Sequence, residues 1–231
     1  MTHDEAKQKL IDAGIILEHE AHCDFTRGHV SVRAPDNSAL FFMKPHSVGF
    51  EEITFDNILT IDLDGKVVAG SARRHSEVFI HTEIYRARPD INAVIHSHPP
   101  YSVALTAAGL ALRPYCQQAI PFIDELPVFT DTLDLIRTPE MGRGVARSLG
   151  PHFAVLMKNH GVAVGGMSLE EAVVRAIMLE GACMVQMITL ATGHLAPEFS
   201  PEDIKAIKLK IANPDQYKIN FDYLVRKMKR L

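Results

Sequence analysis

The stretch Ala93–Pro100 (AVIHSHPP) constrains the fold of this chain more than any other. Apolar, strand-forming residues lead directly into two histidines one residue apart, and two prolines follow them. Successive side chains of a β-strand point to opposite faces, so His96 and His98 are expected to project to the same side. The prolines stiffen the exit from the strand. The pattern predicts a buried strand that ends in two imidazoles, which can either bind one metal ion or form hydrogen bonds within the protein.

A third histidine stands in a similar setting. His160 lies between two apolar segments in LMKNHGVAV, and Gly161 after it allows the backbone to bend sharply. An isolated histidine at such a place is more often a hydrogen-bonded core residue than a ligand. Three together would leave one coordination position open, which is the pattern of a catalytic metal site. Such a site suits Zn²⁺ or Mn²⁺, and Co²⁺ or Fe²⁺ as well.

Glu77 begins a segment with helical periodicity that runs to Arg88. We expect Ser76 to be the N-cap of this helix, with Glu77 in the first turn, where the helix dipole favours a carboxylate. The functional alternative is that Glu77 is an acid/base group or a displaceable fourth ligand beside the ion. His81 lies one turn further on the same helix face, and its role stays open.

The remaining chain alternates between strand and helix signals. Hairpins are expected at 28–43, with a turn at PDNS, and at 57–68, with a turn at Asp64-Gly65. The expected helices span 4–19, 76–88 and 101–108, begin at 138 and 200, and span 168–192. No repeat or Ser/Gly-rich linker divides the sequence, so we expect a single domain over 1–231. Its fold class is α/β, with a central mixed or mostly antiparallel sheet between helices.

Composition excludes some classes of function. The formal net charge is −4, which argues against a basic surface for nucleic acid. No apolar run approaches the roughly 20 residues of a membrane helix, and the N-terminus lacks an apolar signal core. The three cysteines are scattered and odd in number, which is typical of reduced thiols in a cytoplasmic protein.

The motifs resemble those of the class II aldolase/adducin family. The segment SEVFIHTEIYRARPDINAVIHSHPP is followed by KNHG, and the hairpin at 28–33 has the G-x-VSVR signature. The resemblance covers residues 5–195, with four motifs in the same order and spacing. It implies that His96, His98 and His160 bind the metal and that Glu77 is the acid/base residue.

The resemblance also implies an architecture. It predicts a single α/β/α domain that forms a homotetramer with active sites between subunits. Family aldolases place a C-terminal tyrosine of a neighbouring subunit near the substrate. Tyr217 and Tyr223 are the candidates here, without a local motif to choose between them or to exclude a structural role.

The chain departs from the family where sugar-phosphate aldolases hold phosphate with small hydroxyl, amide and glycine groups. Histidines occupy or adjoin these places, and arginine is nearby. The candidate substrate-binding residues are Arg27, His29, His46, Ser47, His75 and Ser76. Loop histidines are often simply solvated. The alternative is that imidazole and guanidinium groups bind a planar carboxylate instead of phosphate.

The leading hypothesis is therefore a metal-dependent carbon–carbon lyase for a small-molecule carboxylate. It would decarboxylate a hydroxylated aromatic or heterocyclic (di)carboxylate through a metal-stabilised, enolate-type intermediate, as in aromatic compound catabolism. One alternative is a class II retro-aldolase for a small hydroxy-acid or sugar (phosphate). Another, from a different class, is a non-catalytic, adducin-like binding protein, although a scaffold has no need of an open metal site.

Overall fold

The computed structural model describes residues 1–22, 24–194 and 198–230. Within them one sheet contains the strands β1 His29–Ala34, β2 Asn37–Met43, β3 Leu59–Asp62, β4 Val67–Ala69, β5 Ala93–Ser97, β6 Val128–Phe129, β7 Ala154–Met157 and β8 Gly161–Gly166. The strand order is β4-β3-β2-β1-β5-β8-β7-β6. Neighbours pair antiparallel except β6 and β7, which are parallel. The mostly antiparallel, mixed sheet predicted from the sequence is therefore confirmed.

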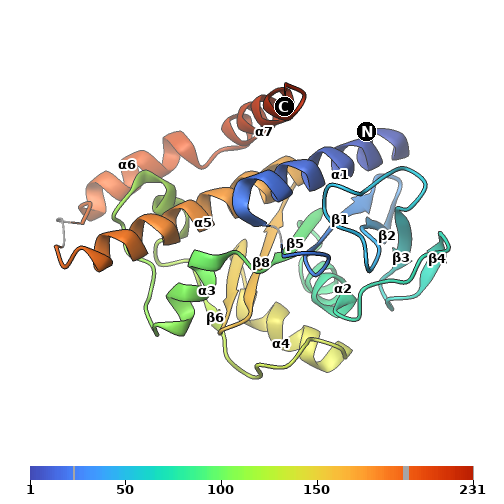
Figure 1. Cartoon of the computed structure of the whole chain (residues 1–231), viewed down its shortest axis with the longest axis horizontal. Helices are drawn as coiled ribbons and strands as arrows, with labels where there is room; N and C mark the ends of the chain where they lie inside the picture. The colour runs from blue at the N-terminus through green and yellow to red at the C-terminus, as the bar shows by residue number, and fades with distance from the viewer. Residues whose placement is uncertain (23, 195–197, 231) are drawn as a thin grey trace.

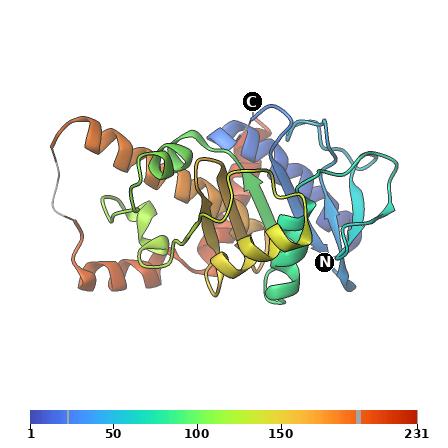
Figure 2. The ribbon, with the colours of Figure 1, turned by 90° about the horizontal axis from the view of Figure 1, so that it is seen from below.

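Helices cover both faces of this sheet (Figure 1). The α-helices are α1 His3–Leu17, α2 Val78–Ala87, α3 Pro100–Ala107, α4 Pro139–Leu149, α5 Leu169–Ala191, α6 Pro201–Ile211 and α7 Pro214–Met228. A kinked segment, Glu18–His22, follows α1, with Ala21 in a left-handed conformation, and a 3-10 helix spans Gln117–Phe122. Helices α1, α3, α5 and α7 share one hydrophobic core with the sheet, and α2 and α4 share the other. Figure 2 shows α2 and α4 together on the second face.

Strand β5 lies at the centre of the sheet, between β1 and β8. Its apolar side chains alternate between the two cores: Ala93 and Ile95 face α1 and α5, while Val94 faces α2. A central strand covered on both faces needs apolar residues at successive positions, which explains the AVI run. His96 continues the register opposite His29 of β1 and Ala163 of β8, and it shares the face of Val94.

The start of α2 differs from the prediction. Glu77, not Ser76, occupies the N-cap position, and its side chain makes no capping hydrogen bond. The Glu77 carboxylate instead accepts a hydrogen bond from the backbone N–H of Ile136, 2.8 Å away. The carboxylate is thus held by a distant loop and points away from the helix it begins.

The longest helix also corrects an expectation. With 23 residues, α5 is long and apolar enough by length and composition to cross a membrane, although the sequence was expected to contain no such run. In the fold α5 packs against β5, β8, α1, α3 and α7, and Leu179 and Cys183 belong to the core that α1 shares. Its apolar composition is explained by this central position.

The two C-terminal tyrosines differ in how far their side chains are buried. Tyr217 is buried, with its ring 4.9 Å from the guanidinium of Arg175, whereas the Tyr223 side chain is exposed on α7. Burial raises the pKa of Tyr217. Within this chain Tyr217 is therefore a packing residue of α7.

Glu180 of α5 supports the strand exit that leads from β5 into α3. Its buried carboxylate accepts hydrogen bonds from the backbone N–H groups of Tyr101 and Ser102, both at 2.8 Å, and from the Ser102 hydroxyl at 2.7 Å. Two of the unpaired N–H groups at the start of α3 are satisfied in this way.

We predict that Glu180→Ala lowers the free energy of unfolding by about 2 to 3 kcal/mol, because it leaves two helix N–H groups and a hydroxyl buried without an acceptor. Urea denaturation measures the change. Glu140→Ala, which removes an exposed carboxylate paired with Arg143, is the control and should change stability by less than about 0.5 kcal/mol. Equal stability of both variants would contradict the capping role.

Candidate metal centre

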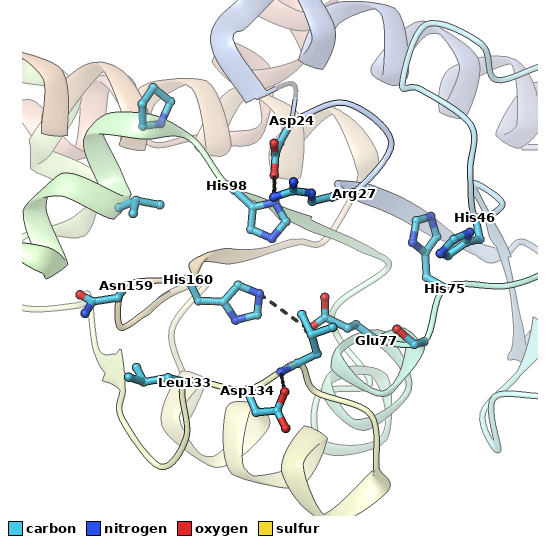
Figure 3. Close-up of a pocket in the computed structure, with 14 residues that line it drawn as sticks. Asp24, Arg27, His46, His75, Glu77, His98, Leu133, Asp134, Asn159 and His160 are labelled. Carbon is cyan, nitrogen blue, oxygen red and sulfur yellow. Dashed lines mark hydrogen bonds and ion pairs between the residues drawn. The ribbon is translucent and has the colours of Figure 1, made fainter.

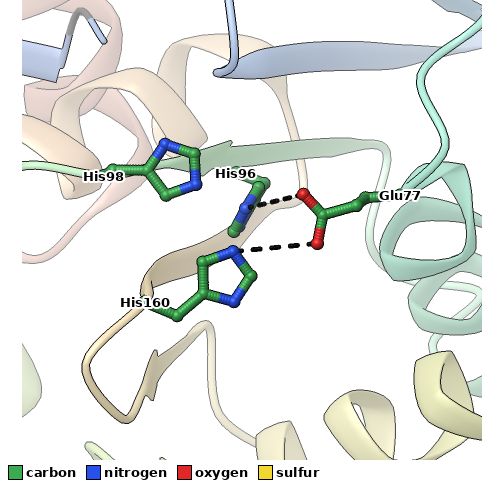
Figure 4. A group of neighbouring side chains, drawn as sticks. All are labelled: Glu77, His96, His98 and His160. Carbon is green, nitrogen blue, oxygen red and sulfur yellow. Dashed lines mark ion pairs between the residues drawn. The ribbon is translucent and has the colours of Figure 1, made fainter. Parts of the chain in front are cut away.

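Glu77, His96, His98 and His160 converge at one end of the sheet (Figure 4). They come from the start of α2, from β5 and the residue just after it, and from the turn between β7 and β8. One ligand atom from each side chain can be chosen so that all four lie within 4.8 Å of one another. The three histidines that the sequence singled out are therefore together, and the carboxylate joins them.

The imidazoles of His96 and His160 both face the carboxylate. The Nε2 atom of His96 lies 3.9 Å from Glu77 Oε2, and Nε2 of His160 lies 3.7 Å from Glu77 Oε1. The other ring nitrogen of His96, Nδ1, donates to the backbone carbonyl of Val162 at 2.9 Å. This bond fixes the tautomer, so that neutral His96 presents the lone pair of Nε2 to the group.

These nitrogens fit a metal ion because they are otherwise unsatisfied. Nε2 of His96 and Nε2 of His160 are buried and have no hydrogen-bond partner among the described residues. Buried polar atoms without partners are costly, and at functional sites they indicate a missing ion or ligand. Three imidazoles and one carboxylate form a donor set suited to a divalent transition ion. Glu77, His96, His98 and His160 are thus consistent with a divalent metal site.

Burial keeps the histidines in the form that binds metal. It lowers the pKa of His98 to about 4, with the neighbouring His160 as the next cause, and it lowers the pKa of His96 well below its usual value. Only a neutral imidazole has a lone pair to give to a cation. Near neutral pH both rings are therefore ready to coordinate without first losing a proton.

The turn that carries His160 has strict backbone requirements. Asn159 adopts a left-handed conformation, with φ at 55°, and its N–H donates to the Thr106 hydroxyl at 3.1 Å. A Cβ atom at Gly161 would lie 2.3 Å from the carbonyl oxygen of Ser97. Only glycine allows this close approach between β8 and β5, and the approach brings His160 next to His96 and His98.

Two further contacts had no signal in the sequence. Asp24, in the loop before β1, places Oδ2 3.1 Å from Nδ1 of His98. A carboxylate beside a metal-binding imidazole orients the ring and raises its basicity. The second contact is the bond from Ile136 to Glu77 described above. Both come from irregular loops far from the histidine motifs in sequence, so no local pattern predicts them.

An open cleft of about 690 Å³ leads to this group (Figure 3). Glu77, His98 and His160 line it together with Asp24 and the loop residues Leu133, Asp134 and Leu135. Of the six residues predicted to contact substrate, four also line the cleft: Arg27, His46, His75 and Ser76.

The other two predicted residues lie close to the cleft without lining it. The Oγ atom of Ser47 is 2.5 Å from Nδ1 of His46. The His29 ring is fully buried, with its centroid 4.5 Å from that of His75 and 4.9 Å from that of His96.

His75 is held by an unusual buried cation. The ammonium of Lys44 donates to the carbonyls of Thr26, Pro45 and Val48 and lies 3.3 Å from Nε2 of His75. Burial lowers the pKa of Lys44 to about 8, and burial together with the Lys44 charge lowers the pKa of His75 to about 3. The three protons of Lys44 are taken by these carbonyls, so none is left for Nε2 of His75. This nitrogen therefore carries the proton of the neutral ring and donates it to the Pro45 carbonyl, 2.9 Å away.

The family model for the Class II Aldolase and Adducin N-terminal domain matches residues 8–187. The chain belongs to this family. It is 34% identical over 196 residues to the decarboxylase NovR of Streptomyces niveus, covering 82% of this chain and 72% of that protein. It is 30% identical over 215 residues to the 3,4-dihydroxyphthalate decarboxylase of Arthrobacter keyseri, covering 88% and 86%.

Solved structures of class II aldolases have the same fold. The L-fuculose 1-phosphate aldolase from Glaciozyma antarctica PI12 superposes with a TM-score of 0.87, covering 98% of this chain and 89% of that one. The sequence identity between them is 23%, so this likeness establishes the architecture alone. The family resemblance and the fold class inferred from the sequence are both confirmed.

We predict that His96→Ala and His98→Ala each weaken binding of Zn²⁺ by about 100-fold or more, because loss of a direct ligand exceeds the 10- to 100-fold cost of losing an outer-shell partner. The metal content after dialysis measures the loss. The exposed His19 provides a matched control, and His19→Ala should bind as much zinc as the unmodified protein. Full metal content in both ligand variants would disprove the site.

We also predict that the metal-free protein loses stability as the pH falls. Burial lowers the pKa of His22 to about 4 and of His81 to about 3, whereas the unfolded value is 6.5. Below about pH 6.5 the unfolded chain therefore binds protons that the folded chain excludes. The free energy of unfolding should fall by up to about 1.4 kcal/mol per pH unit for each such histidine as the pH drops towards 4.

Urea denaturation at about pH 7.5, 6 and 5 tests this dependence. The variant His22→Gln should have a shallower slope than the unmodified protein, because one buried imidazole has been removed. A free energy of unfolding that stays constant over this range would show that these histidines take up protons equally in the folded and unfolded states, which contradicts the prediction.

Proposed function

We propose that this protein is a metal-dependent decarboxylase of hydroxylated aromatic or heterocyclic carboxylates. The observation that carries the proposal is the composition of the cleft, in which Arg27, His46 and His75 line the same cavity as the candidate metal group. Their side chains offer a cation and imidazole nitrogens where an anionic, hydroxylated ring would lie. The identity to two proteins named as decarboxylases supports this reaction.

The candidate metal group would provide both the ion and the proton donor for this reaction. His96, His98 and His160 would hold the ion, and when bound the ion would polarise substrate oxygens as a Lewis acid. The bond between the ring carbon and the carboxylate breaks, CO₂ leaves, and the electron pair stays on the carbon. Glu77, whose two oxygens lie beside His96 and His160, would take up a proton from water in the open cleft and deliver it to that carbon, which replaces the departed CO₂.

Other residues that line the cleft would recognise the substrate. The exposed guanidinium of Arg27 lines the cleft and is paired with Asp24 at 3.4 Å, and its remaining N–H groups can bind a carboxylate. Because Nε2 of His75 donates to Pro45, its Nδ1 is left as an acceptor, which suits a substrate hydroxyl rather than the carboxylate expected from the sequence. The two groups together would select a substrate that carries both a hydroxyl and a carboxylate.

The setting of the enzyme is part of the proposal. We place it in the cytoplasm, in the catabolism of aromatic compounds, as a homotetramer with active sites near subunit interfaces. The free thiols of Cys116 and Cys183 support a reducing compartment. The exposed Tyr223 on α7 is available to a neighbouring subunit.

A thermal-shift screen of zinc-loaded protein tests the substrate class. We predict that hydroxylated aromatic and heterocyclic carboxylates stabilise it and that sugar phosphates do not. A ligand at about 100 times its dissociation constant adds roughly 2.7 kcal/mol, which should raise the melting temperature by about 5 to 10 °C for a chain of this size. Stabilisation by sugar phosphates alone would favour a retro-aldolase. If carboxylates stabilise the protein, an assay of CO₂ release from each of them identifies the reaction.

Glu77→Gln is the matched catalytic variant for this assay. Its amide oxygen can still accept the Ile136 N–H, so the fold should be retained, but it cannot deliver the proton. We expect kcat for CO₂ release to fall by about 10²- to 10⁴-fold. A variant as active as the unmodified enzyme would exclude Glu77 as the proton donor.

A further inference from the structure

Four buried side chains form a hydrogen-bonded chain beneath the cleft. The phenol oxygen of Tyr85 lies 2.8 Å from the Ser31 hydroxyl, which lies 2.6 Å from Nδ1 of His81. Nε2 of His81 then lies 2.6 Å from Nδ1 of His29. Tyr85 and His81 come from α2, and Ser31 and His29 from β1. The role of His81, which the sequence left open, is to connect these two elements.

The positions of the protons decide which of these four side chains donates each hydrogen bond and which accepts it. Among the hydrogen bonds of the described residues, the phenol proton of Tyr85 has one acceptor, Ser31 Oγ. If Ser31 donated back to Tyr85, the buried phenol proton would have no acceptor, which is costly. Ser31 therefore accepts from Tyr85 and donates its own proton to Nδ1 of His81.

The direction then passes through the two imidazoles. His81 is fully buried, and a neutral ring that accepts at Nδ1 has its proton on Nε2. That proton is donated to Nδ1 of His29, so neutral His29 has its own proton on Nε2. These hydrogen bonds therefore make Nε2 of His29 a hydrogen-bond donor.

This donor has no partner among the residues that the structure describes. Nε2 of His29 is buried, and the ring lies between those of His75, which lines the cleft, and His96. An unpaired N–H in the interior costs free energy unless a ligand supplies an acceptor. Of the two neighbouring rings, His75 belongs to the residues proposed to bind substrate and His96 belongs to the candidate metal group.

We propose that Ser31, acting through His81, fixes His29 as a donor whose Nε2–H is reserved for an anionic oxygen of the substrate. The proposal rests on the proposed function and adds to it a positioning role for Ser31 and His81. His29 does not line the open cleft, so the carboxylate oxygen would have to enter between the rings of His75 and His96 to accept from its Nε2–H. His75 binds a hydroxyl from the neighbouring position as an acceptor, so the two histidines have opposite polarity.

The tautomers can be measured without any assay of activity. In zinc-loaded protein with ¹⁵N-labelled histidine, protonated and unprotonated ring nitrogens have widely separated chemical shifts, and His29→Gln and His81→Gln assign the signals. We expect the proton on Nε2 of both His29 and His81. A proton on Nδ1 of His29 in the unmodified protein would overturn the proposal.

Two single variants distinguish the effect of Ser31 on the His29 tautomer from the effect of Tyr85. Ser31→Ala removes the donor to His81, so the fraction of His29 protonated at Nε2 should fall to about half. Tyr85→Phe is the matched control, because Ser31 keeps its hydroxyl and His81 Nδ1 remains its acceptor, so the tautomer should not change. The double variant Ser31→Ala/Tyr85→Phe excludes replacement of Ser31 by the phenol. Unchanged tautomers in both variants that lack Ser31 would overturn the proposal.

Ligand binding tests what the donor is for. We expect Ser31→Ala to bind 3,4-dihydroxybenzoate about twofold more weakly, because about half of the His29 rings would lack the Nε2 proton. Catechol, which lacks the carboxylate, should bind with unchanged affinity. Equal losses for both probes would show general damage to the cleft and overturn the role in carboxylate recognition. The tautomer measurement does not depend on whether the protein releases CO₂. Nε2-protonated His29 together with the carboxylate-specific loss, but without CO₂ release, would refute the decarboxylase and not this inference.

Discussion

The site depends on the pairing of β5 with both of its neighbours in the centre of the sheet. This pairing places His96 opposite His29 on one side and Ala163 on the other, and it brings Val162 to the position where its carbonyl holds the His96 ring. The backbone contact at Gly161 closes the same edge and carries His160 to the group. A strand at the edge of the sheet could not hold imidazoles from two sides in this way.

The same burial determines the electrostatics. Seven histidines (His22, His29, His46, His75, His81, His96 and His98) have a lowered pKa, with burial as the largest cause in each. Neutral rings can coordinate a metal, accept a proton at one nitrogen and donate one at the other. The fold thus converts a chain rich in histidine into a set of directed donors and acceptors, with the buried ammonium of Lys44 as a fixed positive charge behind them.

The two sides of the cleft have different chemistry. On one side the imidazoles of His96 and His160 face a carboxylate and have unsatisfied nitrogens, which suits a cation. Elsewhere in the site, Arg27 and the buried His29 offer donors to the oxygens of an anion, and Nδ1 of His75 offers an acceptor to a hydroxyl. A substrate that spans both sides would have its carboxylate held while charge develops next to the ion, which is the arrangement that a decarboxylase needs.

The sequence by itself determined much of the frame. Strand periodicity predicted that His96 and His98 share a face, and the AVI run predicted a buried strand. The helix and strand boundaries that were predicted agree within about two residues, because hydrophobic periodicity and capping residues such as Thr138 and Ser168 act locally. No bounds were predicted for β6 and α7. The resemblance to the class II aldolase/adducin family also implied that Glu77 acts beside the three histidines.

Only the tertiary structure decided the rest. The contacts of Asp24 with His98 and of Ile136 with Glu77 come from loops whose positions depend on the whole fold. The direction of the chain from Tyr85 to His29 needs the packing of α2 on β1, which brings residues about 50 positions apart within hydrogen-bond distance. Local pattern can place a side chain on a face, but the polarity of its hydrogen bonds is set by long-range neighbours.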